Sequence, residues 1–375
     1  YYSEAQIADW MGKFIEEYGP AGFKTFVIPT GKKDRPSVMI TDTRYPQFIL
    51  AGHMDTVDPW NYPNEGQYDP LAATLDGGYL YGRGAADQKG PIGSALAALA
   101  SYKGRDHELP KGVAFIFTSE EETTMRGIKA VARYFEKLQQ KKPDYTPSFL
   151  LFTGSNRELC YQCRGVAELD LTIKGITGHT AIPQGQIDAH IAGTRALETV
   201  GDVLASLPPT DLGTTTQSIS GGRFGVVGAR GALLTSVANK VPDTFRVIYE
   251  ARPAGQHIDG QPIDAAALAQ MIATQVKNQG AEVVSSRIAL NIAPWQGSLE
   301  LVAPVIALIK SVTGVDEVLL YDASTRGLEE GAILHGVLTR DGTVVVPAAG
   351  YGSGDKNTQH RADERIPTKG VIEDF

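Results

Sequence analysis

Three polar segments follow apolar segments of this chain at nearly constant intervals. His53 comes after the expected buried strand Gln47–Ala51, Asp87 lies in a glycine-rich turn, and Glu122 comes after the apolar run 113–117. Asp87 follows His53 by 34 residues and Glu122 follows Asp87 by 35, which is about one strand–helix unit each time. Such spacing can bring the three residues to the carboxyl end of one parallel sheet, where open α/β folds bind their ligands. The spacing therefore predicts an α/β fold with a polar site at that edge.

The composition allows sizeable cores and narrows the range of partners. The length of 375 residues suggests two or three domains, and the hydrophobic content of 42% is enough for sizeable cores. The formal net charge of −8 and the pI near 5.5 argue against a surface for nucleic acid or anionic membranes. No apolar run approaches the ~18–20 residues of a membrane span. We predict a cytoplasmic protein. No signal-peptide pattern is present, but a leader before Tyr1 could have been removed, so this says little about the compartment.

Hydrophobic periodicity predicts how the chain is divided into domains. Up to residue 153, amphipathic helices alternate with apolar strands, which favours a mainly parallel sheet with helices on both faces. Between residues 166 and 292 the expected order is β-α-β-β-α-β, that of a ferredoxin-like module. A helix at 299–312 and a strand at 343–347 then return to the first pattern. We predict a catalytic domain interrupted by a second, α+β domain, with limits at 1–164, 165–294 and 295–375.

The residues at the strand ends suit a divalent metal, zinc above others. His53 would offer a neutral imidazole, and Asp55 would orient that imidazole. The Asp87 carboxylate could bridge two ions, and Glu122 could bind the second ion, leaving Glu121 free as a general base. Two ions ~3.5–4 Å apart would lower the pKa of a bridging water towards ~7 and polarise a carbonyl. Each segment alone could be a polar turn, a helix cap or a solvated charge run. Their combination predicts a metal-dependent hydrolase.

Three motifs also resemble those of a known enzyme family. They are Gly52–Val57, Gly82–Gly90 and Thr118–Glu122. The family contains acetylornithine deacetylase, succinyl-diaminopimelate desuccinylase, aminoacylase and glutamate carboxypeptidase. The resemblance runs through nearly the whole chain, and it implies two Zn²⁺ ions, for which Co²⁺ or Mn²⁺ can substitute.

Segments in the second half resemble the family's lid domain and its last metal ligand. Gly175–Pro183 is similar to the lid segment whose histidine, here His179, helps to stabilise the tetrahedral intermediate, often across a dimer. Asn239 and Arg252 lie in segments similar to those that contact the substrate's carboxylate or the oxyanion. His360 matches the last metal-binding histidine. The resemblance therefore implies a homodimer formed through the lid domain.

One position departs from the family's pattern. After the next apolar strand, family members usually carry an acid that binds the metal shared with the first histidine. Here Ser155 takes that place, or Asn156 if the register shifts by one. The site next to His53 would then be weak, filled by water, or completed by Glu158 or a Cys160 thiolate. The ordinary alternative is that Glu158 and Cys160 pack or face solvent, so one bound metal or two remain open.

These features predict a zinc-dependent amidohydrolase that cleaves the amide of an N-acyl amino acid or a small peptide. Deacylase and exopeptidase or dipeptidase activities both remain open, because specificity depends on the shape of the pocket and the position of the lid, which the sequence does not give. An alternative is a catalytically weak or inactive relative that binds peptides or acyl-amino acids; Ser155 motivates it, and the Glu121-Glu122 pair disfavours it. Two-metal phosphoester chemistry is disfavoured, because no phosphate-cradling loop or basic cluster accompanies the acids.

Overall fold

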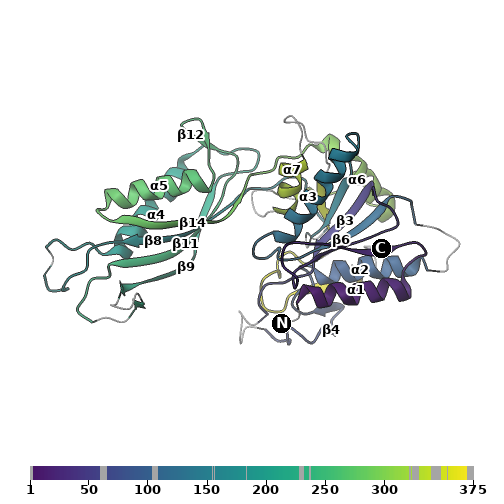
Figure 1. Cartoon of the computed structure of the whole chain (residues 1–375), viewed down its shortest axis with the longest axis horizontal. Helices are drawn as coiled ribbons and strands as arrows, with labels where there is room; N and C mark the ends of the chain where they lie inside the picture. Colours follow the sequence, from purple (N-terminus) through teal and green to yellow (C-terminus); the bar gives the residue numbers. More distant parts are fainter. Residues whose placement is uncertain are drawn as a thin grey trace. The chain divides into compact units, whose positions relative to one another are not determined.

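Two compact units make up the chain, as a computed structural model shows (Figure 1). The first unit comprises Tyr1–Gln162, Gln296–Asp322 and Glu330–Phe375, and the second comprises Cys163–Trp295 with Ala323–Glu329. The structure describes residues 3–59, 66–103, 109–153, 155, 157–182, 184–227, 232–235, 238–320, 322, 329–338, 348–352 and 354–369. The strand predicted at 343–347 lies outside the described residues.

A six-stranded mixed sheet forms the centre of the first unit. Its strand order is β1-β2-β6-β3-β7-β15. The strands are β1 (Lys24–Ile28), β2 (Ser37–Thr41), β3 (Phe48–His53), β6 (Val113–Thr118), β7 (Ser148–Phe152) and β15 (Ala348–Tyr351). The pairs from β6 to β15 are parallel, whereas β1–β2 and β2–β6 are antiparallel. The predicted mainly parallel sheet is thus a mixed one, with three parallel strand pairs and two antiparallel pairs at one edge. The short β1–β2 connection permits antiparallel pairing, since parallel strands need a crossover of a dozen or more residues.

Helices cover both faces of this sheet (Figure 1). The helices of this unit are α1 (Glu4–Tyr18), α2 (Lys89–Ser101), α3 (Arg126–Lys141), α6 (Leu299–Thr313) and α7 (Glu329–Leu338). Met11 of α1 and Leu99 of α2 share one core with Phe115 of β6. On the other side, Phe135 of α3 meets Phe149 of β7 edge to face, with ring centroids 5.2 Å apart. Every residue of β6 is therefore buried, as its uninterrupted apolar run predicts.

A small antiparallel sheet joins distant parts of the first unit. Its order is β16-β5-β4, with β4 at Thr74–Asp76, β5 at Tyr79–Tyr81 and β16 at Arg365–Pro367. Arg365 pairs with Tyr81. Because β5 directly precedes the glycine-rich turn of Asp87, and β16 follows His360, this pairing holds the two segments side by side.

The second unit is built on an antiparallel sheet with the strand order β10-β9-β11-β8-β14. Its main elements follow one another as β8 (Val166–Lys174), α4 (Ala189–Ser206), β9 (Thr216–Val227), β10 (Leu233–Leu234), β11 (Thr244–Arg252), α5 (Ala265–Asn278) and β14 (Glu282–Ile292), with a short hairpin of β12 (His257–Ile258) and β13 (Gln261–Pro262) before α5. Apart from the short β10 and this hairpin, the order is β-α-β-β-α-β.

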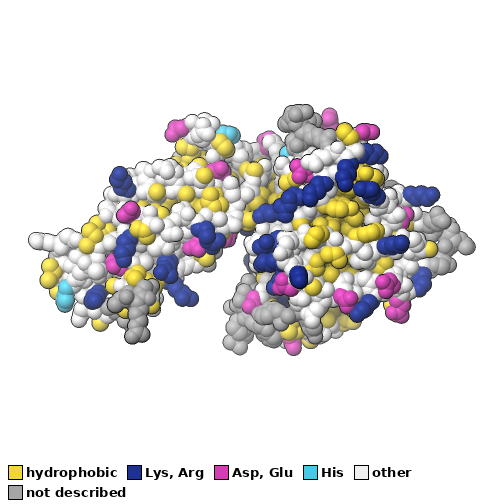
Figure 2. Space-filling model, in the orientation of Figure 1, with side chains coloured by type: hydrophobic (Ala, Val, Ile, Leu, Met, Phe, Trp, Pro, Cys, Tyr) yellow, Lys and Arg dark blue, Asp and Glu magenta, His cyan; other side chains and the backbone are white. Residues whose placement is uncertain are grey.

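Only one face of the second sheet is covered by the two helices. Burial alternates along β8, whose Leu169 and Leu171 join a core with Leu197 of α4 and Leu268 of α5. Asp188 caps α4 by accepting hydrogen bonds from the N–H groups of the first turn. Lys and Arg side chains lie interspersed with Asp and Glu on the face of this unit shown in Figure 2.

Among the helices in the described ranges, none combines the length and apolar character that a membrane crossing requires.

Candidate metal centre

Parallel pairing of β3 and β6 places two polar segments at one edge of the first unit's sheet. His53, the last residue of β3, pairs with Thr118, the last residue of β6. The segment after β6 carries Glu120, Glu121 and Glu122, so these acids start beside the histidine. The carboxyl ends of neighbouring parallel strands meet in this way in α/β folds.

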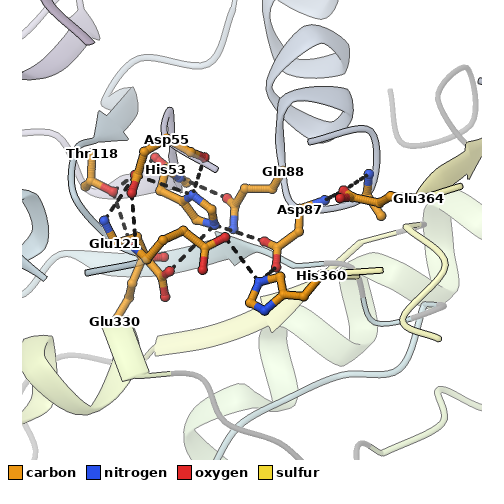
Figure 3. Close-up of polar contacts among 12 residues, drawn as sticks. His53, Asp55, Asp87, Gln88, Thr118, Glu121, Glu330, His360 and Glu364 are labelled. Atoms are coloured by element: carbon orange, nitrogen blue, oxygen red, sulfur yellow. Dashed lines mark hydrogen bonds and ion pairs between the residues drawn. The ribbon is translucent and has the colours of Figure 1, made fainter. Parts of the chain in front are cut away.

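His53 is almost fully buried among carboxylates (Figure 3). Its Nε2 atom lies 2.9 Å from Asp87 Oδ1 and 3.9 Å from Glu121 Oε2. Its Nδ1 atom lies 3.0 Å from the Asp55 carbonyl oxygen and 3.6 Å from Asp55 Oδ1. Burial disfavours the imidazolium, but the carboxylates outweigh it and hold the pKa of His53 well above its ordinary value.

The carboxylate of Asp87 lies between the two predicted metal-binding histidines. Oδ1 faces His53, and Oδ2 lies 3.3 Å from Nε2 of His360. The same His360 nitrogen is 3.2 Å from Glu122 Oε1. Hydrogen bonds to Asp87 and Glu122 raise the pKa of His360 to about 10. One carboxylate with an imidazole on each oxygen is the arrangement that a bridging ligand requires.

Asp55 contacts the acidic segment after β6 in addition to His53, the one partner that the sequence predicts. Its carboxylate accepts hydrogen bonds from the backbone N–H groups of Glu121, at 3.0 Å, and Glu122, at 3.1 Å. Although burial works in the opposite direction, His53 and these N–H groups hold the pKa of Asp55 below its ordinary value. Asp55 therefore fixes the acidic segment as well as the imidazole.

The three consecutive glutamates have different surroundings. Glu120 forms ion pairs with Lys32 at 3.0 Å and Arg126 at 2.5 Å, which neutralise it. Glu121 and Glu122 turn towards the histidines instead. Burial raises the pKa of Glu121 well above its ordinary value, and the neighbouring carboxylates of Glu122, Glu330 and Asp87 add to the effect. A basic carboxylate beside the ligand cluster suits a proton acceptor.

Two compact donor groups result from these contacts. The first is His53, Glu121 and Glu122, and the second is Asp87, Glu122 and His360; within each, one ligand atom per residue lies within 4.8 Å of the others. Imidazole nitrogen and carboxylate oxygen are preferred ligands of zinc. The residues present therefore fit the metal that the sequence predicts.

The candidates for a substitute ligand are engaged elsewhere. Ser155 is fully buried, and its hydroxyl donates to the carbonyl of Gly352 at 3.2 Å. Lys356 Nζ lies 2.5 and 2.6 Å from the two carboxylate oxygens of Glu158. The Cys160 thiol is buried and donates to the carbonyl of Gln162 at 3.4 Å. Asn156 lies outside the described residues. Neither compact donor group among the described residues contains Ser155, Glu158 or Cys160.

Two buried acids that the sequence reasoning missed adjoin the centre. Glu364 accepts hydrogen bonds from the N–H groups of Ala86 and Asp87 at 3.0 and 2.9 Å, and it pairs with Arg83. Arg83 lies in the motif Gly82–Gly90 and Glu364 lies four residues after His360, so their opposite charges were an available signal. Glu330 has no such signal, because it lies in no motif.

Glu330 enters this region from the first turn of α7. It accepts a hydrogen bond from the Thr118 hydroxyl at 2.9 Å (Figure 3). Burial, opposed by His53 and Thr118 and reinforced by Asp55 and Asp87, raises the pKa of Glu330 to about 7.

The remaining predicted site residues belong to the second unit. His179 is exposed; its Nδ1 accepts a hydrogen bond from the N–H of Ala181 at 3.1 Å, and its backbone forms a bridge with Lys240. Asn239, the residue before Lys240, therefore lies on the loop beside His179. Arg252, at the end of β11, donates from Nε to Glu250 at 2.8 Å.

Comparison with known proteins identifies the family. The model of the peptidase family M20/M25/M40 matches residues 49–374. The chain belongs to this family. The predicted family is thereby confirmed.

Curated relatives of this M20 chain include succinyl-diaminopimelate desuccinylases. One from Xanthomonas campestris pv. campestris (strain B100) is 32% identical over 182 residues, which cover 44% of this chain and 46% of the relative. One from Afipia carboxidovorans is 34% identical over 177 residues, covering 44% of each chain. The matched part therefore spans less than half the length of these relatives.

Solved structures similar to this M20 chain include two peptidases. Human carnosine dipeptidase 1 is 15% identical, with a TM-score of 0.69 and coverage of 99% of this chain and 88% of that one. The M20 family metallo-carboxypeptidase Sso-CP2 from Sulfolobus solfataricus is 16% identical, with a TM-score of 0.69 and coverage of 98% and 91%. At these identities the likeness shows a shared mixed α/β fold.

Proposed function

We propose that this M20 chain is a zinc-dependent amidohydrolase that cleaves the amide bond of an N-acyl amino acid or small peptide. The observation that carries the proposal is the Asp87 carboxylate between His53 and His360, with Glu122 on the same cluster. His53, Asp87, Glu122 and His360 would hold the metal. Bound there, zinc would lower the pKa of a water towards ~7 and polarise the scissile carbonyl.

Glu121 is the proposed general base. Its carboxylate lies beside His53 in a buried, acidic environment, where it would accept the proton of the attacking water and return it to the leaving nitrogen. Asp55 would keep Glu121 and Glu122 in place through their backbone N–H groups. Glu364 would fix Asp87 in the same manner.

The substrate we favour is an N-acyl amino acid. The relatives with 32–34% identity are named as desuccinylases, which remove an acyl group from nitrogen. The named dipeptidase and carboxypeptidase share only the fold, at 15–16% identity. A peptide substrate therefore has the weaker support.

Residues 165–294 would act as a lid and dimerisation domain over a catalytic domain of residues 1–164 and 295–375. His179, Asn239 and Arg252 would contact the substrate's carboxylate or the oxyanion, as the sequence resemblance implies. Closure of a lid excludes water and completes a site. Sedimentation equilibrium should then show a dimer, and His179→Ala should lower kcat without changing zinc content. A purely monomeric protein would remove any role for His179 across a dimer.

The test combines metal content with turnover. Elemental analysis should find zinc in the purified protein, and chelation should abolish hydrolysis of N-acetyl and N-succinyl amino acids until zinc is restored. Dipeptides serve as the comparison substrates. Bound zinc without any turnover would support the alternative of a binding protein. No zinc in the protein, even after reconstitution, would rule out the proposed centre.

A further inference from the structure

Glu330 is a buried carboxylate at the same sheet edge as the candidate ligands. It is 3% exposed and lies in the first turn of α7. Its Oε1 atom accepts the hydrogen bond of Thr118, which is the residue paired with His53 across β6 and β3. The strand pairing therefore holds Glu330 near the histidine, and Figure 3 shows it within the same group of polar contacts as Glu121.

The charge around Glu330 differs from that around the other buried acids near the centre. Glu120 is neutralised by Lys32 and Arg126, and Glu364 is paired with Arg83. For Glu330, no ion pair with Lys or Arg is found within the described part of the chain, and its hydrogen-bond donor is a neutral hydroxyl. Buried charges in proteins are generally paired or bind metals. A bound cation would give the Glu330 carboxylate such a partner.

The side of the centre near His53 also lacks the acid that the sequence resemblance implies after β7. Ser155, which stands where the sequence resemblance implies an acid, donates its hydroxyl to a backbone carbonyl. Glu158 is held by Lys356. Asp87 contributes one oxygen, Glu121 is the proposed base, and Glu122, although it belongs to the donor group of His53, also contacts His360. Glu330 is a further buried acid that adjoins this side of the centre.

We propose that Glu330 supplies the anionic metal ligand on the His53 side of the centre, reaching it from α7 instead of from the turn after β7. The inference rests on the proposed metal centre. With Oε1 held by Thr118, the second carboxylate oxygen is left to bind the ion. Glu330 lies outside the two compact donor groups in this structure, so its side chain would shift towards His53 when the ion binds.

Metal binding of variants tests the proposal without relying on turnover. Zinc stoichiometry would be measured by equilibrium dialysis and elemental analysis, and affinity by competition with a chromophoric chelator, for the wild type and Glu330→Gln. Glu158→Gln is the matched control, because it makes the same chemical change in a carboxylate already paired with Lys356. We expect Glu330→Gln to lose one zinc ion, or to bind it more than ~100-fold more weakly, which exceeds the cost of losing an outer-shell partner. Glu158→Gln should bind as the wild type does.

The outcomes separate this inference from the proposed function. If the wild type binds zinc and Glu330→Gln binds it with equal stoichiometry and affinity, Glu330 is not a ligand, while the metal centre stands. If the wild type binds no zinc, both proposals fail together. If Glu330→Gln does not fold, a zinc-edge anomalous map of the wild-type crystal decides instead. An oxygen of Glu330 about 2.0–2.2 Å from zinc supports the proposal, and a separation beyond ordinary coordination overturns it.

Discussion

Both units of this chain contain paired charges, but the first unit also gathers a cluster of acids that these pairs do not balance. In the second unit, charges are balanced in pairs at 2.8–3.0 Å: Lys174 with Asp243, Arg252 with Glu250 and Arg287 with Asp170. In the first unit, Asp55, Asp87, Glu121, Glu122 and Glu330 gather at one sheet edge around two histidines. A folded protein tolerates such an excess of buried negative charge when a cation joins it. Paired charges therefore indicate structure in the second unit, and unbalanced charge indicates a binding site in the first.

The two sheets also differ in how many of their faces are covered by helices. Strand β6 is buried along its whole length because helices cover both faces of its sheet, whereas burial alternates along β8 because helices cover one. The fully covered sheet can hold its strand-end residues in a low-dielectric surrounding, where electrostatic interactions are strong. That difference explains why the large pKa shifts of histidines and acids occur in the first unit.

The largest expected effect comes from removing the proposed base. Glu121→Gln should lower kcat for amide hydrolysis by about 10²- to 10⁴-fold, the usual contribution of general base catalysis. Zinc content should be unchanged. Glu120→Gln is the matched control, since the carboxylate of Glu120 is held by Lys32 and Arg126 and should contribute little to turnover. Equal turnover in Glu121→Gln and the wild type would exclude Glu121 as the base.

Removal of zinc should affect the two units unequally. At a free zinc concentration of 100 times Kd, binding stabilises the folded state by ~2.7 kcal/mol. Hydrogen exchange followed by mass spectrometry should therefore speed up in β3, β6 and the segment 119–124 when a chelator is added. Peptides from β8 and β11 should show no change. A uniform change over both units would contradict the contrast between them.

Removing a paired charge of the second unit should lower the stability of the protein without changing its zinc content. Asp243→Asn should lower the free energy of unfolding by about 1–3 kcal/mol, because Asp243 accepts hydrogen bonds from Lys174 and Thr244. Burial opposes them, but these contacts lower the pKa of Asp243.

The pH dependence of this effect has a defined sign. Because the folded-state pKa is lowered, the stabilisation is fully present above the unfolded pKa of ~3.9 and is lost as pH falls through the folded value. Urea unfolding of both proteins at pH 7 and near pH 3 should show the difference shrinking in acid. A constant difference at both values would argue that charge is not the cause.

The smallest effect is expected for the exposed pair of Arg287 and Asp170. Their side chains are 67% and 45% exposed, so water and salt screen the interaction. Arg287→Ala should change the free energy of unfolding by less than ~1 kcal/mol. Urea titrations in low and high salt provide the measurement. A larger loss, or a loss of zinc, would mean that the pairs of the second unit do more than balance charge.

Much of the fold was predictable from local patterns. Helix α3, Arg126–Lys141, is one of the amphipathic helices that the hydrophobic period predicts before residue 153. The apolar run before Thr118 predicts β6. The mixed order of the first sheet was not predictable, because the direction of a strand depends on which neighbour it joins. Strand pairing between distant segments leaves no periodic signal in either one.

The residues of the candidate site likewise fall into those that the sequence predicted and those that only the tertiary structure revealed. Sequence spacing and motifs by themselves determined the family and singled out His53, Asp87, Glu121, Glu122 and His360, because each follows a strand or a turn with a recognisable pattern. Only the tertiary structure decided that Asp55 holds the acidic segment, that Glu364 fixes Asp87 and that Glu330 adjoins His53. Glu330 is 212 residues from Thr118 along the chain, and Glu364 is 277 from Asp87. Contacts at such separations depend on how helices and strands pack, so an acid such as Glu330, which lies in no motif, shows its surroundings only in the folded chain.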